Sequence, residues 1–342
     1  MTVTVTQPSI NVREKLAELD KPTGIAGEAM LRAETPQEQF NLIGAGRRNL
    51  IINGGFDVWQ RGTSFSTGNE FTADRWYANS GTSTLSASRQ AFTVGQTEVP
   101  YNPSYFLRVD ISGQTTRQLY QKIEDIRRFS GQTVTVTYWA KADVPVTPDV
   151  RVFAHYDGSG AELLDSEANV RIGTSWKKYT HVFNIKSFTG KTIGSSSALQ
   201  LDWTFFDDSD YTFDIAQVQL ELGKVATPFE HRSYGEELAL CQRYFLQYDY
   251  TEFTAIGALW SGNHYASLNF PTTMRTSPTC TNSGAGSFRV FGGGASTEST
   301  GVSYTSISKN GVEISITNTR TNQAVFVRLD SSGDYQRFDA EL

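Results

Sequence analysis

The stretch DIAQVQLELGKVATPFEHRSYGEELALCQRYF, residues 214–245, changes its pattern partway along. It begins with alternating apolar and polar residues, which predict a β-strand, and it ends with the periodicity of a helix. Pro228 and Gly235 mark the turn-rich piece between the two. The rest of the chain has the pattern of β-strands. A single helix with clear start signals therefore indicates a boundary between two β-domains.

The predicted helix has a defined start and an apolar stripe. Ser233 and Glu236 have the spacing of a capping box, in which each side chain bonds the backbone N–H of the other residue. Leu238, Cys241 and Phe245 then fall on one helical face. We expect this helix, residues 233–246, to fill the groove between two β-domains or between two copies of the chain.

Short strand-like segments with Gly- and Asp-rich gaps between them occupy the chain on both sides of the helix. Before the helix, strands are predicted at residues 50–52, 132–142, 150–156, 198–206 and 213–222. After it, six short strands are predicted at residues 253–260, 264–271, 288–293, 302–308, 312–318 and 324–330. This spacing is typical of β-sandwiches. We therefore predict a mainly β fold with two sandwich domains, residues 48–232 and 247–342.

The first 47 residues follow a different pattern. Capping and stop signals predict two short helices with an extended connector between them. Their apolar residues are Val12, Leu16, Leu19, Phe40, Leu42 and Ile43. Two short helices cannot bury their apolar faces alone, so they must pack on the rest of the chain or on another protein. We expect residues 1–47 to be a short helical and extended anchor.

Composition excludes several classes of protein. Hydrophobic residues at 38%, charged residues at 19% and aromatic residues at 12% favour turn-rich all-β structure. The net charge of -6 argues against a nucleic-acid partner, because binding to phosphates needs basic patches. No signal-peptide pattern and no apolar run of about 20 residues is present, so we expect cytoplasmic synthesis without membrane insertion. Cys241 and Cys280 do not form a disulfide framework.

Tryptophans provide the candidates for ligand contact. There are six: Trp59, Trp76, Trp139, Trp176, Trp203 and Trp260. Trp139 and Trp203 lie within alternating strands, and we expect both in the core. An exposed aromatic ring can stack on a sugar ring, so Trp76, Tyr77 and Trp260 are candidate glycan contacts. The acidic and basic residues just before Trp76 would bond a sugar hydroxyl or, alternatively, pair with each other in a turn.

Acidic residues gather at Asp207, Asp208 and Asp210, and oxygen ligands of this kind can hold calcium. The EF-hand pattern is absent, and we favour a solvated acidic turn, so no metal site is predicted. The four histidines are scattered and belong to no H-E-x-x-H or G-x-S-x-G motif. We therefore expect no catalytic residue and no cofactor, and do not expect an enzyme.

Two runs of sequence resemble a module of structural proteins from tailed bacteriophages. They are GRRNLIINGGFDVWQRGTSF with TADRWY, and QKIEDIRRFSGQTVTVTYWAKA with DIAQVQLELGKVATPFEHRSYGEELALCQRYF. Over about residues 47–245 the chain is similar to tail fibre or virion fibre proteins of marine-type phages. The first and last strands of the first domain also resemble those of carbohydrate-binding modules with a galactose-binding-like jelly roll. This likeness implies jelly-roll-like sandwiches but does not by itself establish sugar binding.

The resemblance implies a structural component of a phage particle, located in the virion, and most simply a short tail fibre or appendage for host attachment. The first 47 residues resemble leader segments of phage virion proteins and would bind other tail or capsid proteins. Such fibres are usually trimers, so a homotrimer is implied. Domain 247–342 would face the host and its surface polysaccharide. A head (capsid) fibre or decoration protein is one alternative, and a carbohydrate-binding module without a virion role is the other.

Overall fold

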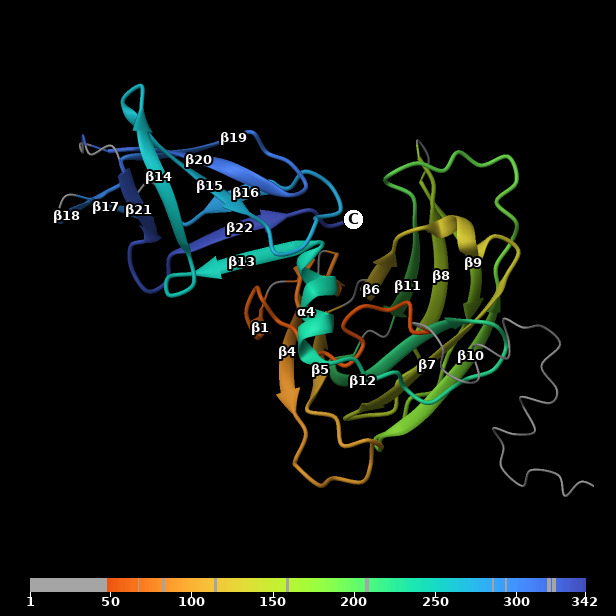
Figure 1. The fold of residues 1–342 in the computed structure, drawn as a ribbon. Coiled ribbons are helices and arrows are strands. Elements are labelled where there is room, and N and C mark those ends of the chain that lie inside the picture. The colour runs from red at the N-terminus through yellow and green to blue at the C-terminus, as the bar shows by residue number, and fades with distance from the viewer. Residues whose placement is uncertain are drawn as a thin grey trace, which may run out of the picture. The chain divides into compact units, whose positions relative to one another are not determined.

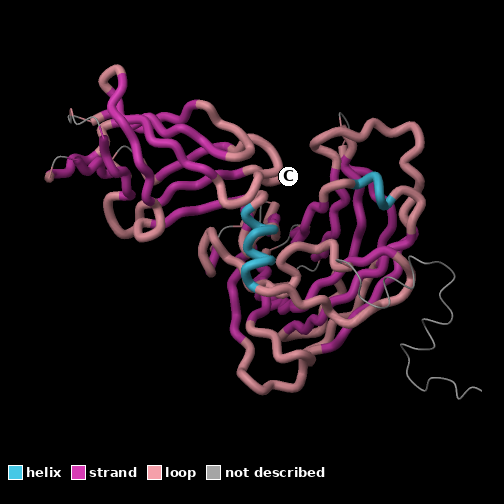
Figure 2. The backbone as a smooth tube through the Cα atoms, viewed as in Figure 1, coloured by secondary structure: helices cyan, strands magenta, loops and turns pink. Residues whose placement is uncertain are grey.

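The computed structural model describes residues 48–342, apart from residues 67, 82–83, 114–115, 158–159, 207–208, 285, 293, 319–320 and 322–323. The predicted anchor segment, with its six apolar residues from Val12 to Ile43, lies outside the described residues. Strands dominate the described residues, where the helical segments are one 3-10 helix and one α-helix, and Figure 2 colours the strands magenta and the helices cyan. The prediction of a mainly β fold with sheets in a sandwich arrangement is confirmed.

The first sandwich consists of two six-stranded antiparallel sheets (Figure 1). In order across the sheet, one contains β1 (Ser64–Phe65), β4 (Thr84–Ala91), β5 (Tyr105–Ser112), β12 (Tyr211–Leu222), β7 (Thr133–Ala142) and β10 (Lys177–Asn184). The other contains β2 (Glu70–Phe71), β3 (Tyr77–Asn79), β6 (Arg117–Ile123), β11 (Ala198–Phe205), β8 (Asp149–His155) and β9 (Ala161–Glu167). A short 3-10 helix, Ile126–Phe129, follows β6.

Alternation along the strands builds the core between these sheets. On β7, Val134, Val136 and Tyr138 are fully buried, as the period of two in the sequence predicts. Trp203 on β11 is also fully buried, which confirms the expectation for that residue. Trp139 points to the other face of β7 and is only half-buried, so the prediction of a core position for it is wrong.

The second sandwich has its own core, formed between a three-stranded and a seven-stranded antiparallel sheet. The smaller sheet contains β13 (Phe245–Asp249), β22 (Tyr335–Asp339) and β16 (Thr279–Asn282). The larger contains, in order, β18 (Ala295–Glu298), β17 (Phe288–Gly292), β21 (Ala324–Leu329), β14 (Thr254–Trp260), β15 (Asn263–Asn269), β20 (Gly311–Thr317) and β19 (Gly301–Thr305). All six predicted strands are present. The limits predicted for the domains, at residues 232 and 246, stay a prediction.

Helix α4 (Tyr234–Gln242) connects the strands of the two sandwiches in sequence. Its capping box of Ser233 and Glu236 is present as predicted. The predicted apolar stripe is wrong in two respects: Leu238 is only half-buried, and Phe245 lies outside the helix as the first residue of β13. The buried side chains of the helix are Cys241 and Glu237. None of the helices in the described ranges has the length and apolar character to cross a membrane.

A clasp of polar side chains fixes the turn between β12 and α4. The Gln219 side chain donates to Glu221 Oε1 (3.1 Å) and to Thr227 Oγ1 (3.1 Å), and its own oxygen accepts from the Glu230 N–H (2.8 Å). The Thr227 hydroxyl donates to Glu221 Oε2 (2.7 Å). Buried polar groups are stable when each has a partner, and here the partners are supplied within a dozen residues. The QLE and ATPFE segments therefore have a structural role.

The beginning of the described chain is held by the same region. The Leu50 N–H donates to the Leu220 carbonyl (2.8 Å), and the Asn49 side-chain amide donates to the Val218 carbonyl (3.1 Å). Ile51 is fully buried. The prediction of a strand at residues 50–52 is nevertheless wrong, because side-chain bonds from Asn49 replace the ladder that a strand would need.

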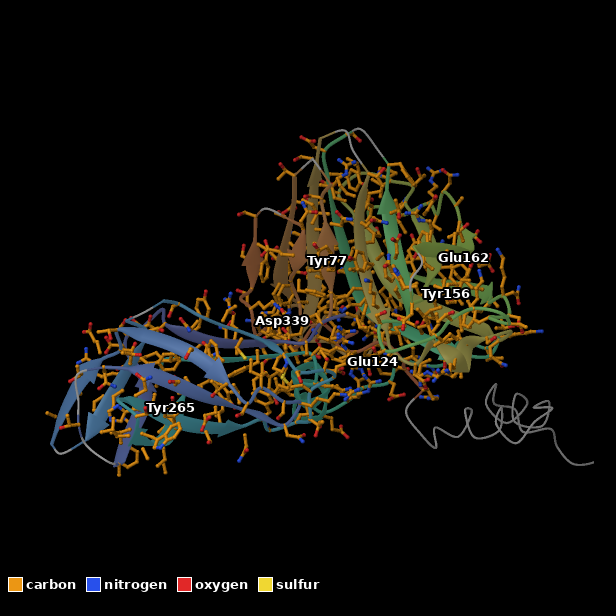
Figure 3. The ribbon with its side chains drawn as sticks, turned by 90° about the horizontal axis from the view of Figure 1, so that it is seen from above. Tyr77, Glu124, Tyr156, Glu162, Tyr265 and Asp339 are labelled. Atoms are coloured by element: carbon orange, nitrogen blue, oxygen red, sulfur yellow. The ribbon has the colours of Figure 1, made fainter. Side chains whose placement is uncertain are left out.

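Charged side chains, which we call the ionic joint, connect residues of the first sandwich with residues 339–341. Arg75 forms an ion pair with Glu341, and these side chains are 1% and 5% exposed. Arg61 lies 3.3 Å from an Asp339 oxygen and 3.2 Å from a Glu341 oxygen. Asp339 is labelled in Figure 3. Such pairs are strong only where both charges keep partners, because each has lost its contact with water.

Aromatic rings add to the ionic joint. The Arg75 guanidinium lies 3.5 Å from the centre of the Tyr244 ring, and that of Arg61 lies 3.5 Å from the centre of the Phe245 ring. A cation over a ring face is attracted by the negative potential of that face. Phe245, expected from the sequence on a helix, instead packs in this joint.

Candidate functional site

The candidate glycan contact at Trp76 is contradicted by the structure. Trp76 is fully buried, and its indole N–H donates to the Asn53 carbonyl (3.0 Å). Its ring lies 5.1 Å from that of Phe56 and 6.0 Å from that of Trp203. Arg75 before it is buried in the ionic joint, so neither side chain meets a ligand. Trp76 is a core residue.

Asp74 is also buried, and neither reading of it from the sequence is correct. It accepts from the Gln60 backbone N–H (2.9 Å) and from the Gln60 side chain, and forms no pair with Arg75. Burial raises its pKa to about 6, and the Arg61 charge and the Gln60 hydrogen bonds oppose that rise. The carboxyl therefore has a structural role beneath the surface.

Tyr77 lies on the outer side of the sheet that contains β3 (Figure 3). It is half-buried: its ring stacks on that of Tyr120 at 5.1 Å and meets the edge of Phe71 at 5.0 Å. Its neighbours therefore cover part of the ring. Glycan contact at Tyr77 stays a prediction.

Trp260 is 71% exposed at the end of β14. It faces Asn263 across the two-residue turn Ser261-Gly262, in which both residues have positive φ, as the tight hairpin turns of antiparallel strands require. The Trp260 ring meets the Tyr265 ring at 5.7 Å. The turn thus fixes the backbone beneath the exposed ring.

Trp260 belongs to a larger exposed surface on the seven-stranded sheet. Ile256 is 72% exposed and Phe326 is 54% exposed, and the two lie directly opposite each other on β14 and β21. Phe291 on β17 lies opposite Phe326 on its other side. We call this surface the outer aromatic face, formed by Ile256, Trp260, Tyr265, Phe291 and Phe326. Phe326 was not singled out from the sequence, although the alternation AVFVRL could have identified it as an outward-facing residue, because Val325 and Val327 point into the core.

A second aromatic surface lies on the first sandwich and combines segments that are distant in the sequence. One cavity of about 250 Å³ is lined by residues that include Trp139, Tyr101, Gln217 and Phe229. An adjoining cavity of about 570 Å³ shares the last three residues and also contains Asp57. We call the two cavities together the Tyr101 groove. No sequence motif pointed to it.

Local backbone geometry shapes the Tyr101 groove. The ladder between β12 and β7 shifts between Ala216 and Gln219, and Gln217 in this bulge has φ of 49°. The Gln217 side chain donates to the Pro100 carbonyl (2.8 Å), which holds the next residue, Tyr101, at φ of 67°. Left-handed conformations cost free energy in residues other than glycine, and such positions concentrate where they serve a site. Bulges likewise re-aim side chains near sites.

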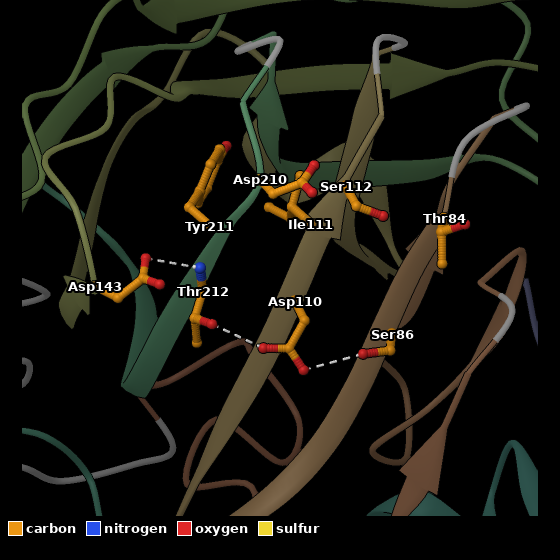
Figure 4. A pocket seen from close by; sticks show the side chains of 9 residues that line it. All are labelled: Thr84, Ser86, Asp110, Ile111, Ser112, Asp143, Asp210, Tyr211 and Thr212. Carbon is orange, nitrogen blue, oxygen red and sulfur yellow. Dashed lines mark hydrogen bonds between the residues drawn. The ribbon is translucent and has the colours of Figure 1, made fainter.

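A third depression, about 390 Å³, is shallow and polar (Figure 4). Asp110 accepts from the hydroxyls of Ser86 (3.1 Å) and Thr212 (2.9 Å), and Asp143 accepts from the Thr212 N–H (2.9 Å). Asp210 lines it too and accepts from the Gly113 N–H (3.2 Å). Each of these three carboxylates therefore accepts at least one hydrogen bond from the protein, and no exposed aromatic ring among the described residues lines the depression beside them.

Of the predicted acidic cluster, Asp207 and Asp208 lie outside the described residues. Within the described ranges, no group of three or more His, Cys, Asp or Glu side chains is arranged to hold a metal ion. Cys241 and Cys280 are both free thiols. The interpretation of residues 207–210 as a solvated turn stays a prediction.

By fold and surface, the chain is a mainly β protein of two sandwiches, each with aromatic side chains on an outer surface. No protein-family model and no curated protein matches it. Among solved structures it is similar to a CBM4 protein, with 17% identity, a TM-score of 0.33, and coverage of 50% of this chain and 98% of the other. The CBM22-1 xylan-binding domain of Paenibacillus barcinonensis Xyn10C is 14% identical, with a TM-score of 0.34 and coverage of 53% and 100%.

A phage structure is also similar. It is the enzymatically active domain of tailspike protein 4 of bacteriophage CBA120, with 15% identity and a TM-score of 0.33. The match covers 51% of this chain and 21% of the tailspike chain. The matched part of this chain therefore spans about a fifth of the length of the tailspike chain.

Proposed function

We propose that this protein is a non-catalytic, carbohydrate-binding component of a phage particle, in the form of a short tail fibre or appendage that attaches to a host surface polysaccharide. The observation that carries the proposal is the outer aromatic face. Ile256, Trp260 and Phe326 are all more than half exposed on one face of one sheet. A contiguous apolar surface of this kind on a folded protein marks an interaction site.

Polysaccharide is the ligand class that this surface fits best. Sugar rings have apolar C–H faces that pack on aromatic rings, and hydroxyls at their edges that bond polar neighbours. Trp260 has Asn263 opposite it and Tyr265 beside it, so both kinds of contact are at hand. The Tyr101 groove gives the first sandwich a second surface of the same chemistry.

The role in a phage particle is supported by the sequence resemblance over residues 47–245. Its most specific segments, QLE and ATPFE, form the clasp between β12 and α4, which explains why those residues occur together in that order. A homotrimer anchored to tail proteins through residues 1–47 completes the proposal. A head fibre or decoration protein would require the same clasp and the same outer aromatic face.

Replacing Trp260 with alanine should weaken polysaccharide binding by about tenfold or more, because an aromatic residue at the centre of a binding surface contributes about 2 kcal/mol or more when it is a hot spot, and about 1.4 kcal/mol is tenfold in affinity. The measurement is isothermal titration of the full chain with purified host surface polysaccharide. Phe206→Ala is the matched control, since Phe206 is 50% exposed on the first sandwich, and its binding should be unchanged. Absence of saturable binding by the unmodified protein would refute the carbohydrate role.

Deleting residues 1–46 should leave a soluble, folded protein that no longer joins particles, because the deletion leaves both cores intact. Mass spectrometry of purified virions measures incorporation, and circular dichroism checks the fold of the shortened chain. Incorporation of the shortened chain at the level of the full chain would contradict the anchoring role. Absence of the full chain from virions would contradict the particle role itself.

A further inference from the structure

The larger cavity of the Tyr101 groove contains charged side chains with unused hydrogen-bonding capacity. The Asp57 carboxylate receives no hydrogen bond from any residue in the described part of the chain. The carboxylate is partly buried, and burial raises the pKa of Asp57 to about 6, assisted by the nearby charge of Glu237 and opposed by that of Arg89. A carboxylate that has lost water without gaining donors favours a ligand that brings donors.

Arg89 supplies the complementary group. Its guanidinium lies over the Tyr105 ring at 4.5 Å, and it is half-buried in the same cavity as Asp57. No side-chain hydrogen bond is found for it among the residues described. The groove therefore offers acceptors at Asp57 and donors at Arg89. A neutral ligand that carries hydroxyl groups can use both, because a hydroxyl both donates and accepts.

Aromatic rings line the groove beside these charges. Tyr101 is 60% exposed, and His231 lies between it and Phe229, with ring centres 5.7 Å and 5.0 Å away. Tyr234 at the start of α4 is also 60% exposed and lines the same cavity. Rings of this kind provide apolar faces for packing while the charged pair bonds the polar edge of a ligand. The cavity of about 570 Å³ lies within the size range of small-ligand pockets.

The ring positions are fixed before any ligand binds. Gln217 ties the Pro100 carbonyl to the bulge of β12, so the exposed Tyr101 projects from a held backbone. On the other side, the clasp holds the segment that carries Phe229, because Thr227 and Glu230 both bond side chains of β12. A preformed groove loses less conformational freedom on binding than a mobile loop does.

We propose that the Tyr101 groove is a binding site for a short neutral oligosaccharide, in which Asp57 and Arg89 bond the hydroxyls of one sugar unit and Tyr101 and Phe229 pack on the ring faces. This site is separate from the outer aromatic face. It depends on the proposed function only for the class of ligand. It would give the chain two points of contact with one polysaccharide, so that binding at one raises the effective concentration at the other.

The test is titration calorimetry of the full chain carrying Trp260→Ala, which removes the main ring of the outer aromatic face. The probes are neutral tetrasaccharides of β-1,4-linked glucose, galactose, mannose and xylose. We expect saturable binding of at least one probe, weakened about tenfold by Asp57→Asn and by Tyr101→Ala. The matched controls are Asp125→Asn, at an exposed aspartate, and Tyr250→Ala, at a tyrosine 43% exposed on the second sandwich, and both should bind normally.

Each outcome has a defined meaning. Absence of saturable binding by all four probes, or unchanged affinity in either groove variant, overturns the proposal. Loss of binding in the groove variants with normal binding in a chain that carries only Trp260→Ala would support this site and contradict the glycan contact at Trp260. Loss of binding in the chain that carries only Trp260→Ala, with normal binding by chains that carry only a groove substitution, would support the outer aromatic face as the binding site and overturn the proposal for the Tyr101 groove. Urea denaturation of each variant confirms that the fold is intact.

Discussion

Replacing Trp76 with alanine will lower the free energy of unfolding by about 3–5 kcal/mol, the usual loss when a large buried ring is removed. Trp76 is fully buried between Phe56 and Trp203, so the variant leaves a cavity that the close-packed neighbours cannot fill. The variant also leaves the Asn53 carbonyl without its indole donor in a buried position. Urea denaturation followed by fluorescence and circular dichroism measures the effect.

Tyr77→Ala is the control, because Tyr77 is the next residue and is only half-buried. It should cost clearly less stability than Trp76→Ala. The two variants also separate a core residue from a ligand contact. A Trp76→Ala protein with nearly unchanged stability but no affinity for polysaccharide would show that the ring serves binding, contrary to its burial.

Replacing Arg75 with alanine will destabilise the protein by about 3 kcal/mol, because it leaves the Glu341 carboxylate buried without its main partner. Glu341 is 5% exposed, and the remaining ion pair with Arg61 at 3.2 Å keeps the loss at the lower end of the range for broken buried pairs. Arg75 also donates to the Lys122 carbonyl (2.5 Å) and packs on Tyr244, and both contacts are lost with it. Differential scanning calorimetry measures the loss.

A second variant separates charge from packing. Arg75→Met together with Glu341→Gln should recover part of the stability, because the pair then contains no unpaired buried charge. Lys191→Ala, which breaks the exposed pair with Glu162 (Figure 3), should produce no measurable change, since exposed pairs contribute little. If Arg75→Ala and Lys191→Ala behaved alike, the ionic joint would have no role in stability.

The strands with the clearest period of two were predictable, but of the twelve strands in the first sandwich only β7, β8, β11 and β12 were predicted. The prediction of 132–142 corresponds to β7, Thr133–Ala142, and the capping box at Ser233 marks the start of α4 as observed. Three strands of the second sandwich, β13, β18 and β22, were not predicted. Each is only four or five residues long, and such short segments carry little periodicity.

The surfaces were less predictable than the strands. Trp76 follows two charged residues, which suggested exposure, but the partner that allows Arg75 to be buried is Glu341, far along the chain. The Tyr101 groove brings together Asp57, Tyr101, Gln217 and Phe229, and no local pattern connects them. Its backbone depends on left-handed conformations at Tyr101 and Gln217, where the sequence has no glycine to signal them. Trp260 ends a predicted strand just before a Ser-Gly turn and is exposed there, while its contact with a glycan stays a prediction.

Residues 339–341 have a further consequence for the exchange of one sandwich by another. Asp339 ends the last strand of the second sandwich and Glu341 follows it, yet the carboxylates of both form ion pairs with arginines of the first. Recombination that exchanged the second sandwich for a foreign one would therefore have to bring matching acidic residues with it. A hybrid lacking them would contain two arginines, Arg61 and Arg75, without their acidic partners, and we expect it to be less stable than the parent chain.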